Sequence, residues 1–159
     1  MRKLNVVALT AAIALAACNP FNREPVTEVS RDANVNSRWN ASLVTPVALA
    51  GAVQMNGTGS MQPGARGEST TLLLSIANAT PGGQHPWQVQ RGQCGSSNQA
   101  FGPVAAYQAL KIGDDGRGQA NATIGEPTPT WGDYSVVVYA SAANAATVVA
   151  CGNLAPPAR

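Results

Sequence analysis

Short apolar segments separated by turn-forming residues place the strongest constraint on the fold of this chain. From residue 38 onward, segments rich in Val, Thr, Leu and Ile alternate with clusters of Gly, Pro, Asn and Asp. No stretch keeps an apolar period of 3.6 residues between these clusters, as an amphipathic helix would. The sequence therefore predicts an all-β body.

The same alternation predicts where the strands lie. Between the predicted strands, Asp114-Asp115-Gly116 is typical of a hairpin turn, because Asp and Gly tolerate positive φ. We interpret these residues as a turn rather than as a carboxylate pair for acid–base chemistry. About eight short strands in one domain predict a Greek-key β-barrel or sandwich. We expect the strands over residues 38–44, 50–56, 69–77, 85–91, 108–112, 118–124, 132–140 and 147–152.

The first 17 residues have the parts of an export signal. Met1-Arg2-Lys3 is charged, residues 4–17 are largely apolar, and small residues precede Cys18. The apolar run is shorter than the about 20 residues that a membrane-spanning helix needs. We therefore expect residues 1–17 to be removed on export.

Leu15-Ala16-Ala17-Cys18 resembles the lipobox of bacterial lipoproteins, in which the cysteine is acylated. The resemblance implies that Cys18 carries lipid such as palmitate, and two or more acyl chains hold a protein stably on a membrane. Asn19 follows, not the Asp that commonly retains such lipoproteins at the inner membrane. We therefore expect a lipid-anchored protein of the bacterial cell envelope, at the outer membrane and facing the periplasm. The alternative is an ordinary secretory signal cut after Ala17.

Residues 18–37 are polar and charged and contain Pro20 and Pro25, which predicts a flexible tether before a single domain over residues 38–159.

The chain has ten basic and eight acidic side chains, and loss of the signal removes Arg2 and Lys3. The mature side chains therefore balance in charge, and we expect no nucleic-acid partner. The membrane, reached through the lipid on Cys18, is the one expected partner, and no pattern identifies a protein or small-molecule ligand.

Three cysteines occur in the chain, and acylation uses Cys18. Cys94 and Cys151 then remain in an oxidising compartment, where two thiols usually pair. Closing a loop of about 58 residues is worth about 4 kcal/mol on the chain-entropy model. The alternative, Cys94 as a nucleophile with His85 as its base, accounts for only one of the two cysteines.

Four segments of the domain carry landmarks in a fixed order. They are Gln84-His85-Pro86-Trp87-Gln88-Val89-Gln90 followed by Gly92-Gln93-Cys94, the Asp-Gly turn in residues 113–120, the late strand over residues 134–139, and Val149-Ala150-Cys151-Gly152-Asn153-Leu154. Together they resemble the copper/zinc superoxide dismutase family, most of all its bacterial lipoprotein-like branch, where a His-Val-His strand is followed by Gly-x-Cys. The resemblance implies an eight-stranded Greek-key β-barrel or sandwich and a disulfide between Cys94 and Cys151.

The metal chemistry of that family does not carry over to this sequence. The two histidines of the His-Val-His strand are matched by Gln88 and Gln90, and a third copper ligand is matched by Tyr139. The anion-guiding arginine is matched by Val148, and residues 95–108, in place of the zinc loop, contain no His, Asp or Glu. Copper and zinc favour imidazole or thiolate over a neutral amide. We therefore predict no catalytic residue, no metal site and no cofactor.

His85 is the one histidine of the chain, so the monomer cannot build a multi-histidine site. It precedes Pro86, upstream of the matched ligand strand, and we expect it to have a strand-edge or packing role.

These observations predict a non-catalytic superoxide dismutase-like domain, or pseudoenzyme, with a binding or structural role in the periplasm. A first alternative is a metal-binding enzyme or metal carrier of the same family with a degenerate site. A second is an envelope adhesion or assembly module, which requires an exposed patch that Trp39, Trp87 and Trp131 could form. The same three tryptophans could instead lie in the core.

Overall fold

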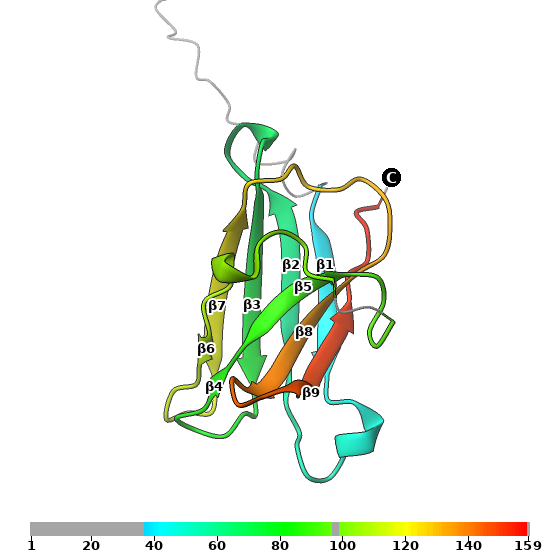
Figure 1. Cartoon of the computed structure of the whole chain (residues 1–159). Helices are drawn as coiled ribbons and strands as arrows, with labels where there is room; N and C mark the ends of the chain where they lie inside the picture. The colour runs from blue at the N-terminus through cyan, green and yellow to red at the C-terminus, as the bar shows by residue number, and fades with distance from the viewer. Residues whose placement is uncertain (1–36, 97–98, 159) are drawn as a thin grey trace, which may run out of the picture.

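The computed structural model describes residues 37–96 and 99–158 (Figure 1). The predicted signal peptide, Cys18 and nearly all of the predicted tether lie outside the described residues. In the part of the chain that is described, no helix has the length and apolar character needed to cross a bilayer. The strands there are β1 (Trp39–Val44), β2 (Asn56–Pro63), β3 (Thr70–Ala77), β4 (Gln84–His85), β5 (Trp87–Arg91), β6 (Leu110–Lys111), β7 (Gly118–Ile124), β8 (Tyr134–Ser141) and β9 (Asn144–Asn153). Single 3₁₀ turns are η1 (Val47–Leu49), η2 (Ala65–Gly67) and η3 (Val104–Ala106).

Seven of the strands form one antiparallel sheet in the order β5-β8-β9-β1-β2-β3-β7, and β4 pairs with β6 separately. The sheet curls into a half-barrel (Figure 1). After β3 the chain forms β5 at the opposite edge of the sheet and returns to lie beside β3 as β7, while β9 comes back to lie beside β1. Such long returns between neighbouring strands are typical of Greek-key connections. The predicted fold class, an all-β Greek-key barrel or sandwich of about eight strands with one disulfide, is confirmed.

The core fills the inside of the curled sheet. Along β1 the buried and exposed residues alternate, because successive side chains of a strand point to opposite faces. Trp39 and Trp87 are both core residues, and each meets a tyrosine ring edge to face, Trp39 with Tyr134 and Trp87 with Tyr107. Complete burial of one such large apolar side chain stabilises the fold by about 1.5–3 kcal/mol.

The predicted strand over residues 50–56 is wrong, because β2 begins only at Asn56. Before β2 the chain forms a loop through η1, whose ends are tied by a hydrogen bond of 3.0 Å from Thr45 Oγ1 to Met55 O. Glycine is depleted in strands, so the local sequence around Gly57 and Gly59 gives little indication of β2. Neighbouring atoms leave no room for a side chain at these two positions. A Cβ at Gly57 would lie 2.2 Å from Ser75 O, and a Cβ at Gly59 would lie 2.7 Å from Val136 Cγ2.

Three further boundaries differ from the predicted ones. The strand expected over residues 85–91 is divided at Pro86, which has no N–H to give to a ladder. The strand expected over residues 108–112 shortens to β6, and the last one lengthens to β9, which forms a hairpin with β8.

The turn at Asp114-Asp115-Gly116 is confirmed. Gly116 N donates to Gly113 O at 3.0 Å, Gly116 has a φ of 71°, and Asp115 Oδ1 accepts from Arg117 N at 3.0 Å. Gly113 N also donates to Arg117 O at 2.8 Å across the turn, but β6 and β7 do not continue this contact as a ladder: β6 pairs with β4 and β7 pairs with β3.

Candidate functional site

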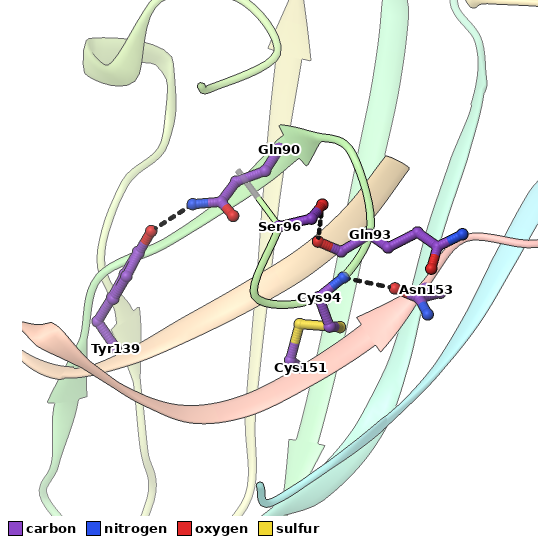
Figure 2. The surroundings of a disulfide bond; sticks show 7 residues. All are labelled: Gln90, Gln93, Cys94, Ser96, Tyr139, Cys151 and Asn153. Carbon is purple, nitrogen blue, oxygen red and sulfur yellow. Dashed lines mark hydrogen bonds between the residues drawn. A yellow bond between two sulfur atoms is a disulfide. The ribbon is translucent and has the colours of Figure 1, made fainter. Parts of the chain in front are cut away.

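Cys94 and Cys151 form a disulfide with a Cα–Cα distance of 6.0 Å, which confirms the predicted pairing. Cys151 is buried in β9, and Cys94 lies in the exposed loop after β5. Cys94 N donates a hydrogen bond of 2.7 Å to Asn153 Oδ1 (Figure 2). Because its sulfur is bonded to Cys151, Cys94 is not the free thiol that the alternative of a nucleophile requires.

The two glutamines that the resemblance matches to copper-binding histidines lie on β5, on the face that points away from the core. Trp87 and Val89 face the core, so Gln88 and Gln90 lie on the opposite face, in agreement with the period of two along a strand. Both glutamines are nevertheless buried, with exposed fractions of 9% and 4%. Gln88 lies opposite Val137 of β8, which in turn lies opposite Cys151 of β9. The glutamines therefore share the face that carries the disulfide.

Tyr139 brings the two glutamines together. Its Oη accepts hydrogen bonds from Gln88 Nε2 at 3.0 Å and from Gln90 Nε2 at 2.7 Å, the second of which is visible in Figure 2. The pairing of β8 with β9 changes register on both sides of Tyr139, and such irregularities re-aim a side chain. Val148 lies directly opposite Tyr139 on β9. The four positions that the resemblance matched to copper ligands and to the anion-guiding arginine therefore lie together in the structure.

This cluster of Gln88, Gln90 and Tyr139 (the amide–phenol cluster) carries no charge at neutral pH. Burial raises the pKa of Tyr139 above its ordinary value of 10.0, and the hydrogen bonds from the two amides partly oppose that rise by stabilising the phenolate. The phenol therefore keeps its proton throughout the neutral range.

A cleft of about 710 Å³ lies beside the amide–phenol cluster. None of the described residues that line it is charged, and most of them are small and apolar. Such a wall suits an uncharged, largely apolar group that hydrogen-bonds to Gln90 or Tyr139. The sequence analysis missed the cleft because separate segments supply its walls and none of them has a motif. The lining residues are Pro46, Ala48, Leu49, Gln90, Cys94, Gly95, Val137, Tyr139, Ala145, Ala146, Thr147, Val148 and Cys151.

The donor set at the cluster does not fit copper or zinc. Amides and a protonated phenol are poor ligands for either ion, which prefer imidazole or thiolate. The Nδ1 atom of His85 is 3.0 Å from the backbone oxygen of Tyr139, and its buried Nε2 has no hydrogen-bond partner among the described residues. Among the described residues, no three His, Cys, Asp or Glu side chains are grouped so that they could hold a metal ion.

The three tryptophans do not form one surface. Trp39 and Trp87 are buried, whereas Trp131 is 80% exposed, in the segment between β7 and β8. Of the three tryptophans, only Trp131 is therefore available for an exposed aromatic patch, and Trp39 and Trp87 have the core role that was the other expectation.

Comparison with known proteins assigns no family. No family model matches this chain, and no curated protein matches it.

Alkaline titration tests the amide–phenol cluster. Replacing Gln90 by leucine is expected to raise the pKa of Tyr139 further, because the variant loses a donor that stabilises the phenolate. The measurement is phenolate absorbance against pH, with the Tyr139→Phe variant identifying the Tyr139 step. Gln93→Leu is the matched control, since Gln93 is an exposed glutamine in the adjacent loop. An unchanged Tyr139 pKa in Gln90→Leu would show that the hydrogen bond does not form in solution.

Proposed function

We propose that this chain is a lipid-anchored protein of the bacterial cell envelope with a non-catalytic, copper/zinc superoxide dismutase-like domain. Lipid on Cys18 holds it at the membrane, most simply the outer membrane, and the domain serves a binding role in the periplasm. The amide–phenol cluster carries the proposal. At the places where the resemblance puts copper ligands, Gln88 and Gln90 instead donate hydrogen bonds to Tyr139.

The direction of these hydrogen bonds argues against a cation at the cluster. Both amide N–H groups point to the Tyr139 oxygen, so the electron pairs of that oxygen are already engaged. A copper ion would have to displace two buried hydrogen bonds and receive only neutral, weak ligands in return. The cluster thus stabilises itself without a metal, as expected for a site that has lost its catalytic role.

The charge of the surroundings supports the same conclusion. Attraction of superoxide anion requires positive charge near the reacting centre. Val148 stands where the family has its arginine, and in the described part of the chain no charged residue lines the cleft beside Tyr139. We infer that the cleft receives an uncharged group instead of an anion, and that binding replaces catalysis at this face.

Metal loading tests the proposal directly. The purified mature chain, supplied with copper and zinc and then dialysed, is expected to retain neither ion in stoichiometric amount and to remove superoxide no faster than buffer with the same trace metal. Elemental analysis and a dismutation assay give the two readouts. Stoichiometric copper with chelator-resistant dismutation would refute the proposal and favour the metalloenzyme alternative.

A variant with Gln88→His, Gln90→His and Tyr139→His provides the matched comparison. It is expected to bind copper at least about tenfold more tightly than the unmodified chain, because three imidazoles replace neutral ligands. Full dismutation should not return, because the zinc loop and the arginine would still be missing. Equal copper affinity in the two proteins would show that the matched positions are not those of a former metal site.

A further inference from the structure

An apolar groove of about 900 Å³ lies at one end of the sheet. We call it the terminal groove and define it by Trp39, Pro63, Pro129, Trp131, Pro156 and Pro157, which supply most of its lining. Among residues 37–96 and 99–158, none of the residues that line it is charged. Trp39 is buried and donates from Nε1 to Pro129 O at 3.0 Å, which holds the segment between β7 and β8 against the core. Trp131, two residues further on, projects into solvent.

The terminal groove lies where the described chain begins. Ser37, the first described residue, is part of its lining, and the segment after β9 forms another part of it. Figure 1 shows the segment from β7 to β8 and the C-terminal end together at this end of the sheet, with η1 at the opposite end. Ser37, the described residue nearest in sequence to Cys18, thus lines the same groove as Trp131.

The length of that connection brings the groove close to the lipid. If flexible, the roughly 20 residues between Cys18 and Ser37 have an end-to-end distance of about 25 Å. An anchor of this length keeps the groove at a high effective concentration near the bilayer. The tryptophan side chain, an apolar ring with a polar N–H, favours the boundary between lipid headgroups and hydrocarbon. The described lining of the groove also has no carboxylate that would repel anionic lipid.

We propose that the terminal groove is a lipid-contact surface, in which Trp131 and the neighbouring prolines enter the headgroup region of the membrane that holds the Cys18 anchor. The inference rests on the proposed lipid anchor. It gives the domain a fixed orientation, with the groove toward the membrane and η1 away from it. The cleft beside Tyr139, whose wall includes Leu49 of η1, then opens on the side away from the membrane.

Tryptophan fluorescence tests this orientation. The lipidated mature chain is reconstituted into vesicles of phosphatidylethanolamine and phosphatidylglycerol, with and without phospholipid brominated near the headgroup. Trp39 and Trp87 are buried, so subtracting the emission of Trp131→Phe isolates Trp131. We expect a blue shift of Trp131 in vesicles and loss of its emission in brominated vesicles.

A tryptophan placed at the far end is the matched control. Val47 lies in η1 and is 91% exposed. In Trp131→Phe/Val47→Trp, quenching by brominated lipid should be at least about twofold weaker than for Trp131, since only the groove end is held at the interface. Equal quenching at both ends would overturn the proposal, because the domain would then have no preferred orientation.

The remaining outcomes separate the inference from the anchor on which it rests. A chain that floats with the vesicles while Trp131 stays unquenched would overturn the lipid-contact surface and leave the anchor intact. A blue shift that depends on protein density and not on bromine would assign the groove to a second copy of the chain and overturn the proposal. A chain that does not float with the vesicles would refute the anchor itself, and with it this inference.

Discussion

Replacing both Cys94 and Cys151 by serine is expected to lower the free energy of unfolding of the mature chain by about 2–5 kcal/mol. The bridge joins residues 57 positions apart and fixes an exposed loop to a buried position of a central strand. Without it, the unfolded chain gains conformational freedom while the folded chain keeps the same core. A small domain has a total stability of about 5–15 kcal/mol, so the loss is a large share of it. Urea unfolding measures the effect.

Two comparisons make this result specific to the bridge. Reduction of the unmodified chain should reproduce the stability of the double variant. Asn153→Ala, which removes only the hydrogen bond from Cys94 N, should cost about 1 kcal/mol. Alkylatable cysteines in material taken from the oxidising compartment, or an unfolding midpoint that reduction does not move, would contradict the prediction.

Replacing Cys18 by serine is expected to abolish acylation of the chain. The proposed acylation site would be lost, and a chain without acyl groups has no lipid anchor on a bilayer. The variant should accumulate as uncleaved precursor or as soluble product. Labelling with palmitate and fractionation of membranes measure both effects.

A neighbouring substitution serves as the control for lipidation. Asn19→Asp should retain the acyl label, and by the resemblance to bacterial lipoproteins it should move the protein to the inner membrane. Acyl label that persists in Cys18→Ser would show that the lipid is attached elsewhere and would remove the basis for the proposed location.

Some strands could be predicted because their signal is local. Along β1, β3 and β7, buried positions alternate with more exposed ones. The predicted ranges of these strands agree with the observed ones within one residue. β2 could not be found in this way. Its glycines are required by contacts with Ser75 and Val136, which are distant in sequence, and local propensity counts only their low preference for strands.

The candidate site shows the same division. The resemblance identified Gln88, Gln90, Tyr139 and Val148 as one set, and the structure places them together. The cleft and the terminal groove are each built from segments that meet only after folding, so no sequence motif predicts either of them. Nothing in the local sequence distinguishes the exposed Trp131 from the two tryptophans of the core, because the difference depends on which segments cover each ring.

The segment around Phe101, which follows the disulfide loop, affects how another molecule could pair with the sheet. It turns back along β5, where Arg91 N donates to Gln99 O at 2.9 Å and Phe101 N donates to Val89 O at 2.8 Å. Phe101 is buried, and the Arg91 guanidinium stacks 5.1 Å from the centre of its ring, which fixes the returning segment. A free sheet edge is a template for strand addition by another molecule. With this segment in place, the outer edge of β5 is already paired at Val89 and Arg91, so a neighbouring chain cannot add a strand along that part of the edge.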